Sequence, residues 1–78
     1  MKIFDNGGET FDRYTLVFKD GSMFGASENP FHPQGFGQFV GDINYESDLS
    51  HLGKEIPKDE LPEPVRKYAV QLVEGMFP

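Results

Sequence analysis

Apolar residues form a first clear pattern between positions 14 and 26. The run Tyr14 to Phe18, YTLVF, is made of aromatic, β-branched and large aliphatic residues, which suit a pleated and half-buried surface. Asp20-Gly21 then offers the backbone freedom that a tight hairpin turn needs, and the run Met23 to Ala26 returns. We therefore predict a β-hairpin within residues 11–27. Its first strand is apolar on both faces, which is typical of the centre of a sheet. Gly25 is expected where a ring or another backbone comes close.

The turn of this hairpin leaves two registers open. If Asp20 and Gly21 form a two-residue loop, Val17 faces Phe24. If Lys19, Asp20 and Gly21 form a type I turn with a glycine bulge, the pairing slips by one residue and the faces exchange. The sequence does not choose between these registers.

The second pattern is a helical one near the C-terminal end of the chain. Apolar residues recur there at i, i+3, i+4, i+7 and i+8 spacing: Val65, Tyr68, Ala69, Leu72, Val73 and Met76. Pro62 and Pro64 suit a first turn, because backbone N–H groups lack intrahelical partners there. Gly75 is a natural stop. The spacing predicts a helix over 62–74 whose apolar stripe packs on one face of the sheet.

Shorter runs add further strands. Residues 2–5 precede the turn residues Asn6-Gly7-Gly8, so a meander of strands over 2–5, 10–18 and 22–27 is expected, with the first strand at an edge. Residues 51–56 supply a candidate fourth strand, with Leu52 and Ile56 on one face. The chain is thus predicted to be one α+β domain over 1–78. It has a small, mostly antiparallel sheet of three to four strands and one C-terminal helix packed on it.

Composition narrows the setting of the protein. The chain has 78 residues and no cysteine, so no disulfide or thiolate metal site is expected, and a reducing compartment fits. No signal peptide and no apolar run of about 20 residues is seen, so the sequence predicts a cytoplasmic protein that does not enter a membrane. The net charge of −6, from 13 acidic and 7 basic residues, disfavours nucleic-acid binding.

Familiar chemical motifs are incomplete in this chain. The oxygen ligands of Asp42-x-Asn44-x-Glu46-x-Asp48 begin like a calcium loop, but Ser47 and Gly53 stand where such a loop needs Gly and Glu. The glycines around Phe36 lack the following helix of a phosphate loop. No serine has a nucleophile-elbow context, and no spacing of the histidines indicates zinc. No metal, cofactor or catalytic residue is therefore assigned.

Arg13 belongs to the most suggestive polar cluster. It follows Asp12 and lies across the Asn6-Gly7-Gly8 turn from Asp5. In one interpretation the guanidinium forks onto a carboxylate and fixes the first hairpin. In the other it is presented to an anionic ligand. The structural interpretation is favoured because surface ion pairs are common.

The segment 28–40 is the main candidate for a binding surface. It is rich in Pro and Gly, yet it carries three phenylalanines, Phe31, Phe36 and Phe39, and also His32. These rings either cap an open end of the small core or form an aromatic patch for a partner protein. His32 either packs within the loop or takes part in binding. The sequence does not decide between these alternatives, either for the phenylalanines or for His32.

Four motifs, taken in order, resemble a known group of proteins: DNGGETFDRYT (5–15), ENPFHPQGFGQ (28–38), HLGKEIP (51–57) and LPEPV (61–65). The group consists of small, functionally unassigned bacterial proteins associated with phage and plasmid genomes. The similarity covers most of the chain and is weakest over residues 42–50. It implies a bacterial or phage origin and a cytoplasmic setting, and it transfers no activity.

Two functional hypotheses follow. In the first, this is a non-enzymatic accessory protein that binds a partner protein through Phe31, His32, Phe36, Phe39 and Arg13. In the second, it binds or hydrolyses a small, nucleotide-like anion held by Arg13, His32 and the glycine-rich loop. A homodimer formed by the helix or an uncovered strand edge is a further alternative.

Overall fold

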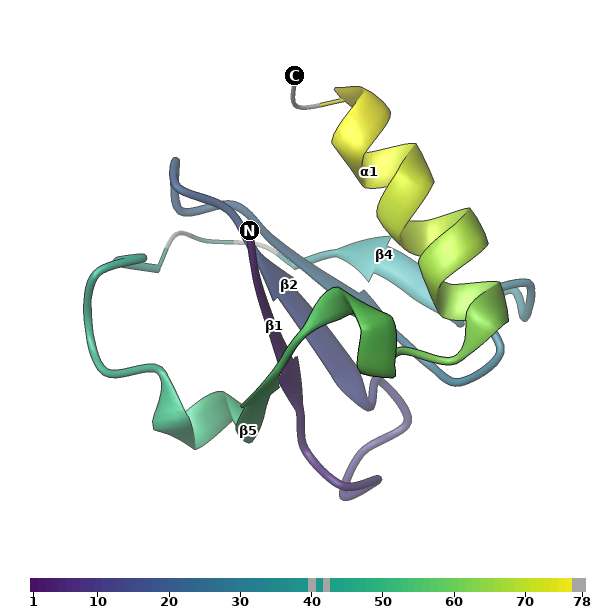
Figure 1. The fold of residues 1–78 in the computed structure, drawn as a ribbon, viewed down its shortest axis with the longest axis horizontal. Coiled ribbons are helices and arrows are strands. Elements are labelled where there is room, and N and C mark those ends of the chain that lie inside the picture. Colours follow the sequence, from purple (N-terminus) through teal and green to yellow (C-terminus); the bar gives the residue numbers. More distant parts are fainter. Residues whose placement is uncertain (40, 42, 77–78) are drawn as a thin grey trace.

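The computed structural model describes residues 1–39, 41 and 43–76 (Figure 1). For Met76 it describes the backbone alone. The centre of the structure is one antiparallel sheet in the order β4-β3-β2-β1-β5. The five strands are β1 (Lys2–Asp5), β2 (Tyr14–Val17), β3 (Met23–Ala26), β4 (Phe36–Gln38) and β5 (Lys54–Ile56). A helix at the C-terminal end packs on the sheet, so the predicted α+β class is confirmed. No helix in these described ranges is long and apolar enough to cross a membrane.

The hairpin β2–β3 takes the second of the two predicted registers. Val17 pairs with Met23 and Leu16 with Phe24. The Phe18 N–H donates to the Ser22 carbonyl at 3.0 Å, which leaves Lys19, Asp20 and Gly21 as a three-residue loop. Gly21 has a φ of 93°, a conformation that glycine adopts without steric cost. The glycine bulge therefore sets the register of the central pair of strands.

The sheet has five strands and not the three to four that were predicted. The strand missed by sequence is β4, only three residues long, which pairs with β3 through Ala26 and Phe36. Gly35 precedes this strand and Gly37 is its middle residue, so the sequence shows no alternation of polar and apolar side chains there. The prediction that β1 is an edge strand is also wrong, because β5 pairs with it on the side away from β2.

The predicted strand over 51–56 is shorter in the structure. Residues Ser50–Leu52 form a short 3-10 helix, η1, and only Lys54–Ile56 joins the sheet. Leu52 and Ile56 do not share a face. Ile56 packs with the residues beneath the C-terminal helix, whereas Leu52 packs with Phe4 and Val17 on the opposite side of the sheet.

The C-terminal helix covers residues 63–76. It begins in the proline-containing turn that the sequence predicted, but it continues through Gly75, where the sequence predicted its end. Its first part, Val65–Val70 (η3), is π-helical and continues into α1 (Gln71–Met76). A π-helix bonds residue i to i+5, so an extra residue enters each turn. Val65 and Val70 therefore come to the same face, and both are fully buried.

This wide turn alters the predicted apolar stripe. Tyr68 and Leu72, expected to face the sheet, are 41% and 47% exposed. Val70, outside the predicted stripe, takes a buried place beside Ala69 and Val73. The remaining member of the predicted stripe is Met76, whose side chain lies outside the described residues. The helix packs on the sheet as expected, but through a face that is rotated from the predicted one.

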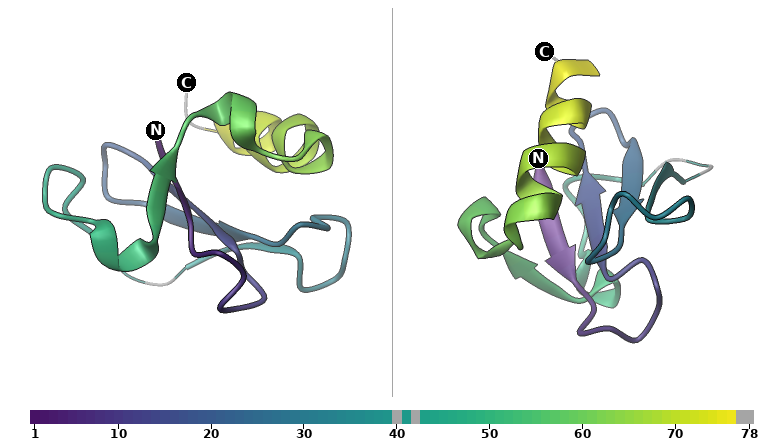
Figure 2. Two further views of the ribbon diagram at one scale, coloured as in Figure 1. Left: turned by 60° about the horizontal axis from the view of Figure 1, so that its bottom comes forward. Right: turned by 90° about the vertical axis from the view of Figure 1, so that its right-hand side faces the viewer.

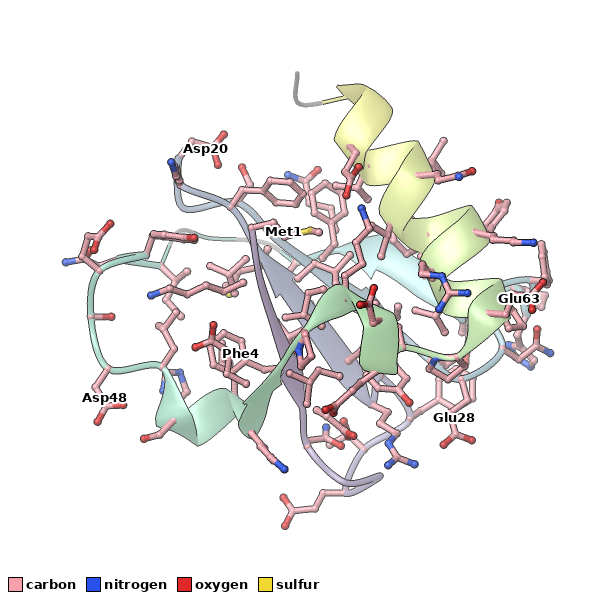
Figure 3. The ribbon with its side chains drawn as sticks, in the orientation of Figure 1. Met1, Phe4, Asp20, Glu28, Asp48 and Glu63 are labelled. Carbon is pink, nitrogen blue, oxygen red and sulfur yellow. The ribbon has the colours of Figure 1, made fainter. Side chains whose placement is uncertain are left out.

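The sheet is covered on both faces, by different kinds of structure. Figure 2 shows the C-terminal helix as a layer on one side of the strands. On the other side, the long connection between β4 and β5 places Leu49 against Phe4 and Val17. Figure 3 shows Phe4 pointing from β1 toward the loop that carries Asp48. The connection runs from one edge of the sheet to the other and closes the second face on its way.

Candidate functional site

The loop between β3 and β4 is closed by its own hydrogen bonds. The Ser27 N–H donates to the Gly35 carbonyl at 2.8 Å, and the Gly35 N–H donates to the His32 carbonyl at 2.8 Å. Ser27 Oγ donates to the Asn29 carbonyl at 2.7 Å. These bonds fix the base of the loop, so the residues at its tip are held in defined positions.

The three phenylalanines of the predicted binding segment have three different environments. Phe36 is half-buried and stacks on Phe24, with ring centroids 5.9 Å apart and planes inclined by 11°. The Phe39 ring covers Gly25, because a Cβ atom added to Gly25 would lie 2.6 Å from Cζ of Phe39. The expectation that a ring comes close to Gly25 is therefore confirmed. Phe31, in contrast, is 66% exposed.

Phe31 forms an exposed aromatic pair with Tyr68 of the C-terminal helix. Their ring centroids are 4.7 Å apart. Together with Pro64, Glu63 and Lys67 they line an open hollow of about 470 Å³. Glu63 and Lys67 pair with each other at 2.9 Å along one side of it. We call Phe31, Pro64 and Tyr68 the aromatic surface.

Tyr68 is the residue of this surface that sequence reasoning missed. Its spacing from Val65 and Leu72 places it in the predicted apolar stripe that faces the sheet. The π-helical turn brings it out, and its ring instead contacts Phe31 and lies 6.5 Å from the ring of Phe36. The available signal was chemical: a tyrosine carries a polar group at the end of its ring and suits a position that is half in water.

Arg13 lies between two carboxylates, one on each side of it. Its Nε donates to Oδ1 of Asp5 at 2.8 Å and its Nη2 donates to Oδ2 at 3.2 Å, which is the fork that the structural interpretation predicted. Its Nη1 donates to Oε1 of Glu28. The Arg13 hydrogen bonds, aided by the Gly7 N–H, lower the pKa of Asp5 despite its partial burial. The two carboxylates in turn raise the pKa of Arg13.

A second hollow, of about 400 Å³, lies beside this ion pair. It is formed by the β1–β2 and β3–β4 loops, and its lining residues are Gly8, Thr10, Phe11, Arg13, Ser27, Glu28, Asn29 and His32. We call it the Arg13 hollow. The rings of Phe11 and His32 meet edge to face there, with centroids 5.2 Å apart. The structure thus brings the predicted site residues Arg13 and His32 together.

The five predicted site residues therefore fall into separate places. Phe31 lies on the aromatic surface, and His32, the next residue, lines the Arg13 hollow with Arg13 itself. Phe36 and Phe39 pack against the two faces of the sheet. In Figure 3, Glu63 and Glu28, which line the aromatic hollow and the Arg13 hollow, lie on the same side of the molecule. The two candidate sites are neighbours that share one loop.

The described part of the acidic segment that begins like a calcium loop, from Asn44 to Ser50, forms ordinary turns. Oδ1 of Asn44 accepts the Glu46 N–H at 3.0 Å, and Oδ1 of Asp48 accepts the Ser50 N–H at 3.0 Å. Asp42, the first position of the motif, lies outside the described residues. Within the described part of the chain, no group of three or more His, Cys, Asp or Glu side chains is placed to hold a metal ion.

No family model, curated protein or solved structure matches this chain. The resemblance to small proteins of phage and plasmid genomes therefore stays a prediction. The aromatic surface and the Arg13 hollow are the two candidate sites of the described residues.

Proposed function

We propose that this protein is a non-enzymatic accessory protein of bacterial or phage origin that acts in the cytoplasm by binding a partner protein. The observation that carries the proposal is the exposed contact between Phe31 and Tyr68. An aromatic ring buries about 150–250 Å² when it is fully covered, so two partly exposed rings leave apolar area whose burial would add stability. A partner protein that covers both rings recovers it.

The aromatic surface is also prepared for binding. Tyr68 is carried by a helix whose opposite face is fully buried, and Phe31 by a loop closed through Ser27 and Gly35. Rings that are already positioned lose little conformational freedom on binding. Tyrosine and other aromatic residues are enriched where interfaces concentrate their energy. Leu72, 47% exposed and four residues beyond Tyr68, extends the apolar area along the helix.

Affinity capture from a bacterial lysate tests the proposal with matched variants. Phe31→Ala removes an exposed ring of the aromatic surface. Phe11→Ala removes a ring of similar exposure, 56%, that lines the Arg13 hollow instead. We expect the wild type and Phe11→Ala to retain one specific protein and Phe31→Ala to lose it. Loss of a buried interface ring costs about 2 kcal/mol or more, which is a roughly thirtyfold weaker complex.

Folding must be unchanged for this comparison to be informative. Phe31 is exposed, so we expect Phe31→Ala to keep the wild-type circular dichroism spectrum and its unfolding free energy within about 0.5 kcal/mol. Phe36→Ala is expected to lower that free energy, because Phe36 packs against the core. If Phe31→Ala still captures the same protein as strongly as the wild type, the proposal fails.

A second candidate function is the binding of a small anion. The observation that favours it is that Arg13 and His32 line the same hollow. The carboxylates of Asp5 and Glu28 already engage the guanidinium, which opposes a highly charged ligand such as a nucleotide. A thermal-shift screen against nucleotides tests this function, since a ligand at a hundred times its Kd stabilises by about 2.7 kcal/mol. Light scattering tests the separate homodimer hypothesis.

A further inference from the structure

The two carboxylates that bind Arg13 are held to very different degrees. Asp5 accepts hydrogen bonds from Nε and Nη2 of Arg13, and it also accepts the Gly7 N–H at 2.8 Å. Its side chain is only 21% exposed. The Glu28 side chain is 61% exposed, and among the described residues its only side-chain hydrogen bond is the one from Nη1 of Arg13. Asp5 therefore orients the guanidinium, and Glu28 occupies its outer corner.

Glu28 is easily displaced from that corner. An ion pair between exposed side chains changes an equilibrium by no more than about fivefold, because water competes for both partners and a long side chain must be ordered. If another carboxylate replaces Glu28, the number of charges around Arg13 stays the same. The exchange therefore needs no new counter-charge.

Other residues of the Arg13 hollow have hydrogen-bonding capacity to spare. Nδ1 of His32 accepts the Gln34 N–H at 3.1 Å, so the proton of the neutral ring resides on Nε2. Within the described part of the chain, neither Nε2 of His32 nor the side-chain Nδ2 of Asn29 donates to a protein acceptor, whereas the Asn29 backbone N–H donates to Ser27 Oγ. Phe11 adds a ring that is 56% exposed. The lining thus combines donors for an oxyanion with an apolar wall.

We propose that the Arg13 hollow is a binding site for a small aromatic carboxylate, and that Glu28 is its built-in competitor. The ligand carboxylate takes the place of Glu28 on Nη1 of Arg13, and its apolar part lies against Phe11. The volume of about 400 Å³ is within the range of small-ligand sites. Because Glu28 competes for Nη1, it lowers the affinity of the site for carboxylates by up to about fivefold.

Benzoate is the probe that tests this site, with benzamide as its uncharged analogue. Binding is followed by amide NMR titration of the full chain, with Gly8, Asn29 and His32 as reporters. Glu28→Gln keeps the shape of the side chain and removes the competing charge, so we expect it to bind benzoate about three- to fivefold more tightly than the wild type. Benzamide affinity is expected to be the same in both proteins.

Glu74→Gln is the matched control. Glu74 is also an exposed carboxylate in an ion pair, with Lys58 at 2.9 Å, and it does not line the hollow. The variant makes the same change in net charge and is expected to bind benzoate like the wild type. The proposal is overturned if both variants tighten benzoate binding equally, if benzamide follows benzoate, or if neither the wild type nor Glu28→Gln shifts the three reporter signals.

Discussion

The two faces of the sheet are closed in different ways. Under the C-terminal helix, the buried cluster runs across the strands from Ile3 to Ala26 and reaches the helix at Val65 and Val73. On the opposite face, the buried cluster is smaller and consists of Phe4, Val17 and Leu49. A helix offers a continuous apolar face, whereas a loop contributes single side chains. Most of the buried apolar side chains of the described residues therefore lie on the helix face, and the loop mainly closes the remaining surface.

Polar contacts compensate in part on the loop face. Nζ of Lys2 donates to the Tyr45 carbonyl at 2.8 Å and also lies 4.5 Å from the centre of the Tyr45 ring. The Ile43 N–H donates to the carbonyl of Gly21 at 3.1 Å, which ties the loop to the β2–β3 turn. The loop is therefore fastened at identifiable points and not by a regular backbone ladder.

The largest expected effect comes from Leu16→Ala. Leu16 is fully buried in the central strand beneath the helix, so its replacement leaves a cavity among side chains of regular elements that cannot collapse easily. We expect the unfolding free energy to fall by about 3–5 kcal/mol, measured by urea denaturation. A loss below that of Leu49→Ala would contradict the assignment of most of the burial to the helix face.

Leu49→Ala is the matched substitution on the other face. Leu49 is 4% exposed, but its neighbours Ile43, Tyr45 and Leu52 are only partly buried. A loop of this kind relaxes into the space that is left, so we expect a loss of about 2 kcal/mol in the same denaturation experiment. The helical circular dichroism signal should persist up to the unfolding transition. Loss of helix at low denaturant would show that the two faces are more tightly coupled than the packing indicates.

Acid should weaken the ion pair between Asp5 and Arg13 before it affects the apolar packing on either face of the sheet. Hydrogen bonds from Arg13 hold the pKa of folded Asp5 below its ordinary value of 3.8. A lowered folded pKa adds stability above the ordinary value, and that stability is lost as the pH falls through the folded pKa. Below about pH 4, we expect the unfolding free energy of the wild type to decrease by an additional amount that Asp5→Asn does not show.

Urea titrations of the wild type and Asp5→Asn across this acid range measure that additional decrease. Asp20 and Asp48 also have a lowered pKa, because each accepts a backbone N–H in a turn. Their contribution is present in both proteins, so only the difference between the two curves reports on Asp5. Parallel curves would show that the fork on Arg13 adds no stability.

The smallest effect is expected for Lys2→Met, which keeps the apolar stem of the side chain and removes its charge. The hydrogen bond to the Tyr45 carbonyl and the contact with its ring are lost together. Both groups are partly exposed, so we expect a decrease of about 0.5–1 kcal/mol in the unfolding free energy. Arg66→Met is a suitable control, because the Arg66 side chain makes only a long hydrogen bond within the described residues, from Nη1 to the Leu61 carbonyl at 3.4 Å on the helix side.

The sequence predicted the elements whose local signals agree with their surroundings. The hairpin and the C-terminal helix carried both an apolar pattern and suitable turn residues, and both are present. It missed β4, because three residues with a glycine in the middle show no periodicity and become a strand only by pairing with β3. It placed Tyr68 and Leu72 wrongly, because a period of 3.6 residues does not describe a π-helical turn.

The candidate site was predictable only in part, because its geometry depends on contacts between residues far apart in the sequence. The segment containing Phe31 and His32 was identified from its unusual phenylalanine content. That Phe36 and Phe39 pack on opposite faces of the sheet, while Phe31 meets Tyr68, depends on contacts between distant parts of the chain. The role of Glu28 was also hidden, because it reaches Arg13 from a different loop.

Both outermost strands, β4 and β5, are three residues long. A short outer strand presents few free backbone groups, so it is a poor template for the growth of fibrils by strand addition. The net charge of −6 adds mutual repulsion between molecules. A chain with eight phenylalanines in 78 residues can thus keep an exposed aromatic surface and still resist self-aggregation.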